Sequence, residues 1–600
     1  MANQLHTPYR FVPLSRWIYM PDWSPLVSHD HPFEDGVSGV LHYTLRNATP
    51  LLVGAEQQGH DNQPKTIRWA RDPHGKPVIP STSLKGMLRQ TLEIASFGKF
   101  QHIDENHFSF RKVSSNSEYL NIIRKSKVIS AWLKYDDGKK TWQLKRCEYA
   151  KVKHKDINQA YDTALKNAQT AIEKYREFPL TKTLQCDFEI RNQEQGDRLW
   201  AKNINSGGSK AYLVFTNKRI EGRQNREDFD FSYAFFFDKN ESKVEADEKI
   251  NRLVQEMFDS HGNRDPSERK GDQITFLKTH QHPDFGIPVF ALIDKKTDKP
   301  KAFGLAKMPR ILYKNSAAAL ANKQQGEARM SAHIFDLPEL LFGALREKGM
   351  SLKSRVFFSD AQLTENKGLN VSAPVTLGNP KATFTNAYVE QTSKRTISYE
   401  SDSARLAGWK RYPVQQAFNV NKTDSGNTRV KTQLELLNEQ SVFEGKITFH
   451  NLKPEELGAL LWCIQLGNDQ HDTQRFHSLG HGKSLGAGAV QMQTTIERLQ
   501  PNKLSADGSC PNDIATLVER FEQNMARAFN SNQLHAWAES TQIKHLLALS
   551  DPKNFVSEKL EYMDLKDFRA VKNAHEKMPQ VSQGGLPIER NDKASPSSCE

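Results

Sequence analysis

A glycine-rich segment at residues 478–493, SLGHGKSLGAGAVQMQ, combines backbone freedom with polar side chains that could bind a ligand. Glycines alternate with these polar side chains, in the order Gly480, His481, Gly482, Lys483, Ser484, Gly486 and Gly488. Glycines let a backbone approach a phosphate group closely, and a lysine amine can neutralise its charge. The pattern predicts a phosphate-binding loop, and a plain connection between a helix and a strand is the alternative.

The tripeptide Gly482-Lys483-Ser484 resembles the end of an ATP-binding P-loop, but two features exclude that function. A P-loop needs a glycine five residues before Gly482, and His477 stands there. The segment also follows an expected helix and precedes an expected strand, which is the reverse of the order in a P-loop.

Two basic side chains share one face of an expected helix that begins near residue 81. Lys85 and Arg89 are four residues apart, so they lie on the same side, away from the leucines. This face could contact the backbone of a nucleic acid. The alternative is an ordinary solvated face on which Arg89 pairs with Glu93.

The stretch 111–155 is strongly basic and also aromatic. It holds 13 Lys or Arg against four acidic residues. The interleaved rings are Tyr119, Trp132, Tyr135, Trp142 and Tyr149. Basic grooves with stacking aromatics suit single-stranded nucleic acid, so Trp132 and Trp142 are candidate contacts. The alternative is a hairpin whose aromatics pack inward.

Titratable side chains gather in the polar loop 55–79, namely Glu56, His60, Asp61, Asp72 and His74. They could serve as acids and bases on RNA, or they are ordinary loop residues. No H-E-x-x-H motif and no matching cysteine set occurs, so neither a metal site nor another cofactor is expected.

Composition narrows the partners and the compartment. The formal net charge is +12, which favours a polyanion, nucleic acid before an anionic membrane. There is no run of about 18 apolar residues and no apolar signal region at the N-terminus, so neither membrane insertion nor secretion is expected. The five cysteines are scattered, which fits a reducing cytoplasm.

Two strand–helix units must position these groups. Alternating apolar residues predict strands at 37–53 and 443–449. Leucines at four-residue spacing predict a helix after Pro80, with Ser81 or Ser83 as N-cap, and a second helix begins at Pro454. With closing strands, two such units predict an α+β, ferredoxin-like (RRM-type) sandwich.

A long insertion separates the two halves. We expect a hairpin at 128–153, helices at 157–177 and 241–258, and strands at 231–238 and 286–294. The segments 315–330 and 364–404 are expected to be rich in loops. The predicted division is 1–96 for the first half of the core, 97–300 for a basic inserted α+β region, 301–440 for a second segment with loops, 441–500 for the second half, and 501–600 for a helical extension with a frayed end.

Three passages together resemble the RAMP superfamily of CRISPR-associated proteins. Residues 71–89, RDPHGKPVIPSTSLKGMLR, are similar to its D-P-x-G-x-P-x-I-P-G-S-S-L-K-G-x-L-R signature, with Thr82 as a mild departure. Leu341-Phe342-Gly343 and residues 354–361, SRVFFSDA, resemble its F-G and S-R-V-x-F-S-D-A passages. The glycine-rich segment resembles its C-terminal loop, and the order and spacing agree. Further passages resemble a long subfamily of these proteins.

This resemblance implies an RNA-binding backbone subunit of a type III effector complex that acts in antiviral defence. CRISPR RNA is the implied partner, target RNA is a second candidate, and other effector subunits are the implied protein partners. Binding is expected through phosphate and shape rather than through sequence. The implied RNA contacts are Arg68, Arg71, Lys85, Arg89, His481, Gly482, Lys483 and Ser484.

Two alternatives remain open at this point. Some relatives cut target RNA with an aspartate between the first strand and the first helix, where Asp61 is the nearest match and His60 its neighbour. A ribonuclease that cuts target RNA or processes CRISPR RNA is therefore one alternative, and an accessory protein that acts alone is the other. Asp72 is interpreted as part of a turn.

Overall fold

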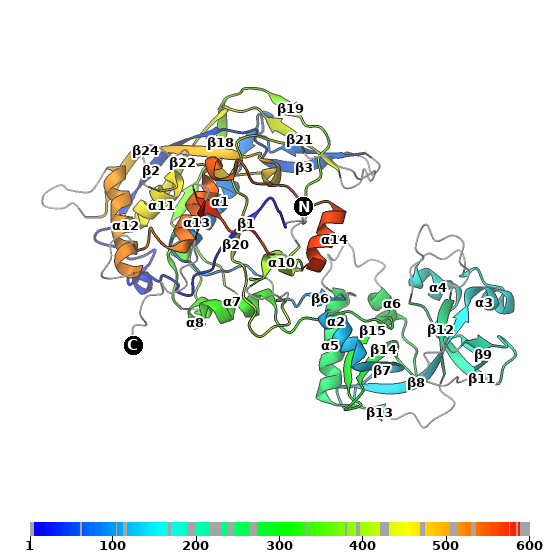
Figure 1. Cartoon of the computed structure of the whole chain (residues 1–600). Coiled ribbons are helices and arrows are strands. Elements are labelled where there is room, and N and C mark those ends of the chain that lie inside the picture. Colours follow the sequence, from blue (N-terminus) through cyan, green and yellow to red (C-terminus); the bar gives the residue numbers. More distant parts are fainter. Residues whose placement is uncertain are drawn as a thin grey trace. The chain divides into compact units, whose positions relative to one another are not determined.

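The computed structural model divides the chain into two compact units, which Figure 1 shows. Unit 1 comprises Met1–Asp104 and Ala317–Glu600, and unit 2 comprises Glu105–Ser316. The predicted inserted region, 97–300, overlaps unit 2. The residues that the structure describes are 5–59, 63–103, 105–111, 117–165, 170–188, 200–216, 231–236, 244–262, 273–331, 333–346, 349–378, 381–391, 397–420, 431–467, 475–503, 513–529, 536–574, 577–583 and 586–588.

The main sheet of unit 1 is built around one long central strand. β2 (Val37–Asn47) alternates buried and partly exposed residues, as its sequence predicts. It pairs antiparallel with β22 (Val442–Leu452) on one side and with β24 (Ala489–Pro501) on the other. Beyond β22 come β17 (Val356–Phe358) and β18 (Ala361–Glu365), and the edges are β5 (Val78–Ile79) and β23 (His477–Ser478).

Two helices follow the first and third principal strands. α1 (Ser81–Ala95) buries Leu84, Leu88 and Leu92, which are the predicted apolar face. α11 (Pro454–Gln465) packs against α1 and also against α12 (Ile514–Phe529). A Cβ on Gly458 would lie 1.9 Å from the Leu517 carbonyl oxygen, so this glycine permits the close approach of α12. The chain therefore runs strand–helix–strand–strand–helix–strand, with the spatial order β24-β2-β22-β17/β18.

The start of α1 differs from the prediction. Pro80 is the N-cap, and neither Ser81 nor Ser83 caps the helix with its side chain. Instead, the Ser81 N–H donates to Asp360 Oδ1 at 2.7 Å. The sequence could not show this because the acceptor comes from a distant strand connection, which places a carboxylate at the positive end of the helix.

The second RAMP-like passage is anchored by a buried ion pair. The guanidinium of Arg355 donates to Glu456 Oε2 at 2.9 Å and to the Asn451 carbonyl, and both charged side chains are fully buried. Removing one partner of such a pair leaves an uncompensated charge in the core. Arg355 therefore fixes the segment after α9 (Leu337–Phe342) against α11.

Smaller sheets complete unit 1. One has the order β19 (Leu369–Val371), β21 (Thr432–Leu437), β4 (Lys65–Trp69) and β3 (Gly54–Gln58). β1 (Arg10–Val12) pairs with β20 (Trp409–Arg411), and β25 (Ser582–Gln583) pairs with β26 (Leu586–Pro587). The remaining helices include α10 (Thr385–Tyr388), α13 (Thr541–Ser550) and α14 (Leu565–Ala574). Most of the end that was expected to fray lies outside the described residues.

The structure of segment 315–330 differs from the prediction. It was expected to be loop-rich, but α7 (Ala317–Gln325) and α8 (Glu327–Met330) occupy most of it. The run Ala317–Leu320 contains three alanines, which have the highest intrinsic helix propensity, and Leu320 and Ala321 are buried. Propensity and burial outweigh the polar composition.

Unit 2 holds one large sheet. Its order is β10 (Ala201–Lys202), β9 (Thr183–Phe188), β11 (Ser209–Val214), β12 (Phe231–Phe236), β8 (Thr141–Lys153), β7 (Ser126–Asp136), β14 (Ile287–Asp294) and β15 (Pro300–Gly304), with β13 (Val244–Glu245) beside β8. β7 and β8 form the predicted hairpin.

Helices and one short strand pair complete unit 2. The helices are α2 (Glu118–Arg124), α3 (His154–Tyr161), α4 (Ala171–Glu177), α5 (Glu248–Gly262) and α6 (Gln273–Thr279). Asp247 accepts from the Ile250 N–H, so α5 starts later than the predicted 241. β6 (Ser109–Phe110) pairs with β16 (Ile311–Leu312), so the chain enters and leaves the unit side by side.

Candidate functional site

The glycine-rich loop of unit 1 is a closed turn held by its own backbone. Gly480, Gly482, Gly486 and Gly488 all have positive φ, between 74° and 88°. The His481 N–H donates to the Leu52 carbonyl at 2.8 Å, and the loop contains a short 3-10 turn, Lys483–Leu485. A Cβ on Gly488 would lie 1.9 Å from the Leu479 carbonyl oxygen. The positive φ angles and the close backbone contacts of the loop therefore require these glycines. The same contacts fix the position of Lys483 in the loop.

Lys483 belongs to a cluster of three cations, which we call the loop cluster: Lys410, Arg411 and Lys483. Lys410 and Arg411 lie on β20, and the following segment packs on the loop through the Asn419 N–H, which donates to the Leu485 carbonyl at 2.8 Å. Arg411 is 8% exposed and donates to Gln90 Oε1 at 3.2 Å. Within the described part of the chain, no carboxylate lies within ion-pair distance of any of the three.

Burial and mutual repulsion change the proton affinity of this cluster. Burial lowers the pKa of Arg411 to about 10. Burial, and then the charge of Lys483, lower the pKa of Lys410 to about 8. Burial and the charge of Arg411 likewise lower the pKa of Lys483. A concentration of buried positive charge without a carboxylate is costly, and a bound anion would relieve that cost.

Tyrosine rings surround the amine of Lys410. Its Nζ lies 4.1 Å from the ring centre of Tyr9, 5.0 Å from that of Tyr412 and 5.7 Å from that of Tyr388. Attraction to the ring faces partly offsets the loss of hydration. The rings thereby keep a cation at this place without supplying a counter-charge.

His481 and Ser484 flank the cluster. Partial burial of His481, followed by the charge of Lys483, lowers the pKa of its imidazole, which is therefore neutral near pH 7. Ser484 is buried within the loop, as is Gly482.

The basic face of α1 is engaged with the second RAMP-like passage. Lys85 Nζ donates to Ser354 Oγ at 3.0 Å, and Arg89 donates to Glu93 at 3.1 Å and to the Gly343 carbonyl at 3.3 Å. Burial raises the pKa of Glu93 to about 7, against the lowering effect of Arg89. The pairing of Arg89 with Glu93 is the alternative that the spacing left open.

Arg68 and Arg71 meet at a single carboxylate. Both donate to Glu435 Oε1, at 3.1 and 3.0 Å, and the Trp69 N–H donates to Glu435 Oε2 at 2.9 Å. Burial acts to raise the pKa of Glu435, but these hydrogen bonds and charges lower it overall. The side chains of Arg68 and Arg71 remain 40% and 38% exposed.

The two tryptophans lie in unit 2 and differ in burial. Trp132 is fully buried in the hydrophobic core, where its ring contacts Tyr212, Phe235 and His282. Trp142 is partly buried and packs against Tyr135 and Phe258. Inward packing therefore describes Trp132 better than a place in a groove.

The proposed catalytic pair, His60 and Asp61, lies outside the described residues. Among the residues that are described, no group of three or more His, Cys, Asp or Glu side chains could hold a metal ion. No helix in this part of the chain combines the length and apolar character needed to cross a membrane.

The site brings Lys483 and His481 together but adds two residues that the sequence reasoning missed, Lys410 and Arg411. The available signal was a basic dipeptide flanked by aromatics, Trp409-Lys410-Arg411-Tyr412. It was missed because the pair is far from the loop in sequence.

Comparison with known proteins finds a similarity to one family over part of the chain. Residues 44–264 match the family model of the RAMP superfamily, a range that starts within β2, contains the first RAMP-like passage and extends to the end of α5. Over this range, the chain is similar to the RAMP superfamily. No curated protein matches it.

Among solved structures, the chain matches the "Cryo-EM structure of the Type III-B Cmr-beta bound to cognate target RNA". The sequence identity is 10% and the TM-score is 0.18. The match covers 76% of this chain and 96% of that one.

Proposed function

We propose that this protein is an RNA-binding subunit of a type III-like CRISPR effector complex, which holds the backbone of CRISPR RNA and contributes to antiviral defence in the cytoplasm. Its RAMP core is a ferredoxin-like sandwich formed by β2, α1, β17/β18, β22, α11 and β24. The strand order and antiparallel pairing support this assignment. Target RNA and other effector subunits are the further partners.

The observation that carries the proposal is the loop cluster. Three partly or fully buried cations without a described carboxylate partner match an anion with several oxygens, and the RNA backbone is a row of such anions. Phosphate contacts bind RNA without regard to sequence, as a subunit that holds many different CRISPR RNAs requires.

The first test is sequencing of the RNA that co-purifies with the protein from its own host. Enrichment of CRISPR RNAs with the repeat-derived tag supports the proposal. Random RNA alone, or none, contradicts it and favours an accessory protein that acts alone.

A second test isolates the loop cluster. The variant Lys410→Ala/Lys483→Ala should bind CRISPR RNA at least tenfold more weakly, as measured by fluorescence anisotropy. The matched control is Lys446→Ala/Lys503→Ala, which removes the same charge from unit 1 at two surface ion pairs. Because each lost phosphate contact lowers the slope of log affinity against log salt by about 0.7, the double variant should lower it by about 1.4. Equal losses in both variants would contradict a specific role of the cluster.

A further inference from the structure

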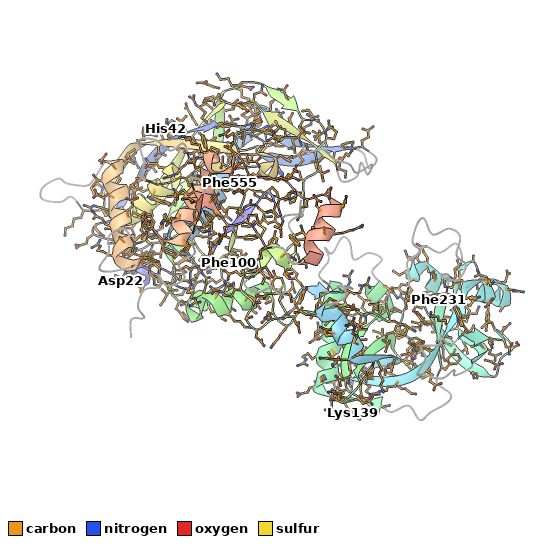
Figure 2. The ribbon with its side chains drawn as sticks, viewed as in Figure 1. Asp22, His42, Phe100, Lys139, Phe231 and Phe555 are labelled. Atoms are coloured by element: carbon orange, nitrogen blue, oxygen red, sulfur yellow. The ribbon has the colours of Figure 1, made fainter. Side chains whose placement is uncertain are left out.

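One face of the unit 2 sheet carries partly exposed aromatic rings and lysines in register. Alternate residues of a strand lie on opposite faces, so Tyr149, Lys151 and Lys153 of β8 share one face. Directly opposite them on β12 stand Phe235 and Tyr233, which are buried, and Phe231, which is partly exposed. Trp200 joins this row through a bridge to Lys151. We call these residues the aromatic face, and Figure 2 labels Phe231 within it.

Helices cover the other side of the same sheet. His154 of α3 contacts the hydroxyl of Ser232 at 2.7 Å, and Ser232 alternates with the aromatic-face residues of β12. Phe258 of α5 packs on Trp142, which is likewise on the opposite side of β8. Helices therefore cover the far side of the sheet. On the aromatic face, Phe235 and Tyr233 are buried in the hydrophobic core, whereas Tyr149, Phe231 and Trp200 are partly exposed.

Lysine amines lie over these rings. Lys151 Nζ is 4.4 Å from the ring centre of Phe231 and 5.6 Å from that of Trp200. Lys153 Nζ is 5.5 Å from the ring centre of Trp200, and Lys307 Nζ is 4.2 Å from that of Tyr149. Rings and cations thus lie next to one another on this face.

We propose that the aromatic face binds single-stranded RNA, with bases stacked on Phe231, Trp200 and Tyr149 and phosphates held by Lys151 and Lys153. On binding, a base takes the ring surface that an amine covers, and the amine moves to the neighbouring phosphate. Base stacking replaces the contact between amine and ring, and the amine gains a contact with a phosphate, so the exchange favours the bound state. The aromatic face belongs to unit 2 and the loop cluster to unit 1, so this proposal, which rests on the proposed function, adds a second RNA surface.

The test uses the full chain in the Lys410→Ala/Lys483→Ala background, so that the loop cluster does not mask the result. The probe is a fluorescein-labelled oligouridylate of about 12 nucleotides, a length that matches known single-strand binding sites. Trp200→Leu/Phe231→Leu removes the rings but keeps apolar volume and charge, and it should weaken binding about tenfold. Lys151→Ala/Lys153→Ala should have a similar effect.

The matched control is Lys139→Ala/Lys140→Ala, which removes the same charge from the exposed β7–β8 turn of unit 2, away from Phe231 (Figure 2). It should change affinity less than twofold. Ultraviolet cross-linking of the unmodified chain to the same RNA should place the adduct on Trp200, Phe231 or Tyr149. Unchanged affinity in the leucine variant, or cross-links elsewhere only, would overturn the proposal and indicate a face that packs against protein. If the loop-cluster tests fail, the result for the aromatic face can still be interpreted, because different variants test the two surfaces.

Discussion

At the scale of residues, the chain combines cations that are neutralised with cations that are not. Arg68, Arg71 and Arg89 each donate to a carboxylate, whereas Lys410, Arg411 and Lys483 have none among the described residues. Positive charge alone therefore does not identify the site, since only the second group would be stabilised by binding an anion.

The pKa of Lys410 predicts how RNA binding depends on pH. Burial and Lys483 lower this pKa to about 8, so the amine is charged below pH 8 and loses its proton as the pH rises through that value. RNA affinity should therefore fall between about pH 7 and pH 9, by roughly the weight of one phosphate contact. The Lys410→Arg variant stays charged and should show a flat profile over this range. An unchanged slope in that variant would show that another group titrates.

Arg411 gives a prediction of opposite sign for stability and binding. Replacing its poorly compensated guanidinium with methionine should raise the free energy of unfolding by about 1 kcal/mol while weakening RNA binding about tenfold. The matched control is Arg355→Met, which breaks the buried pair with Glu456 and should cost about 3–5 kcal/mol. Chemical denaturation measures the free energy of unfolding of both variants. A loss of stability in Arg411→Met would mean that its charge is compensated in the free protein.

At the scale of elements, periodicity in the sequence predicted the parts that obey local rules. β2, α1, β22, α11 and the β7–β8 hairpin lie where alternation, four-residue spacing and turn residues indicated. The features that could not be predicted depend on distant partners. The N-terminus of α1 is capped by Asp360, and the loop cluster forms only when β20 meets the glycine-rich loop.

The glycine-rich loop allows a direct test of why its glycines are there. Gly488→Ala should cost more than about 2 kcal/mol, because a positive φ is unfavourable for alanine and the new Cβ would clash with the Leu479 carbonyl. Gly326 also has a positive φ, but open space surrounds its Cβ position, so Gly326→Ala should cost only about 1–2 kcal/mol. Thermal and denaturant unfolding measure both. An equal loss of stability in the two variants would mean that the loop backbone shifts to accommodate the new Cβ.

At the scale of the whole molecule, the chain consists of unit 1, which is interrupted in sequence by unit 2 with its own sheet and hydrophobic core. The predicted inserted region, 97–300, overlaps unit 2, Glu105–Ser316, but the sequence could not show how the two ends of this unit meet. They meet through strand pairing. Phe110 faces Ile311 across β6 and β16, and the Phe110 and Tyr313 rings stack with centres 4.3 Å apart.

Because β6 and β16 pair where the chain enters and leaves unit 2, we predict that unit 2 can be removed. Residues 111–310 can be replaced with a linker of about four Gly or Ser residues. The linker then joins Phe110 to Ile311, which are already direct antiparallel partners. The shortened chain should remain folded, as judged by cooperative thermal unfolding, and should keep CRISPR RNA affinity within about threefold, because the loop cluster lies wholly in unit 1. It should lose the binding of oligouridylate that survives Lys410→Ala/Lys483→Ala in the full chain. A shortened chain that unfolds would show that unit 1 depends on unit 2. One that keeps the residual binding would place the second RNA surface in unit 1.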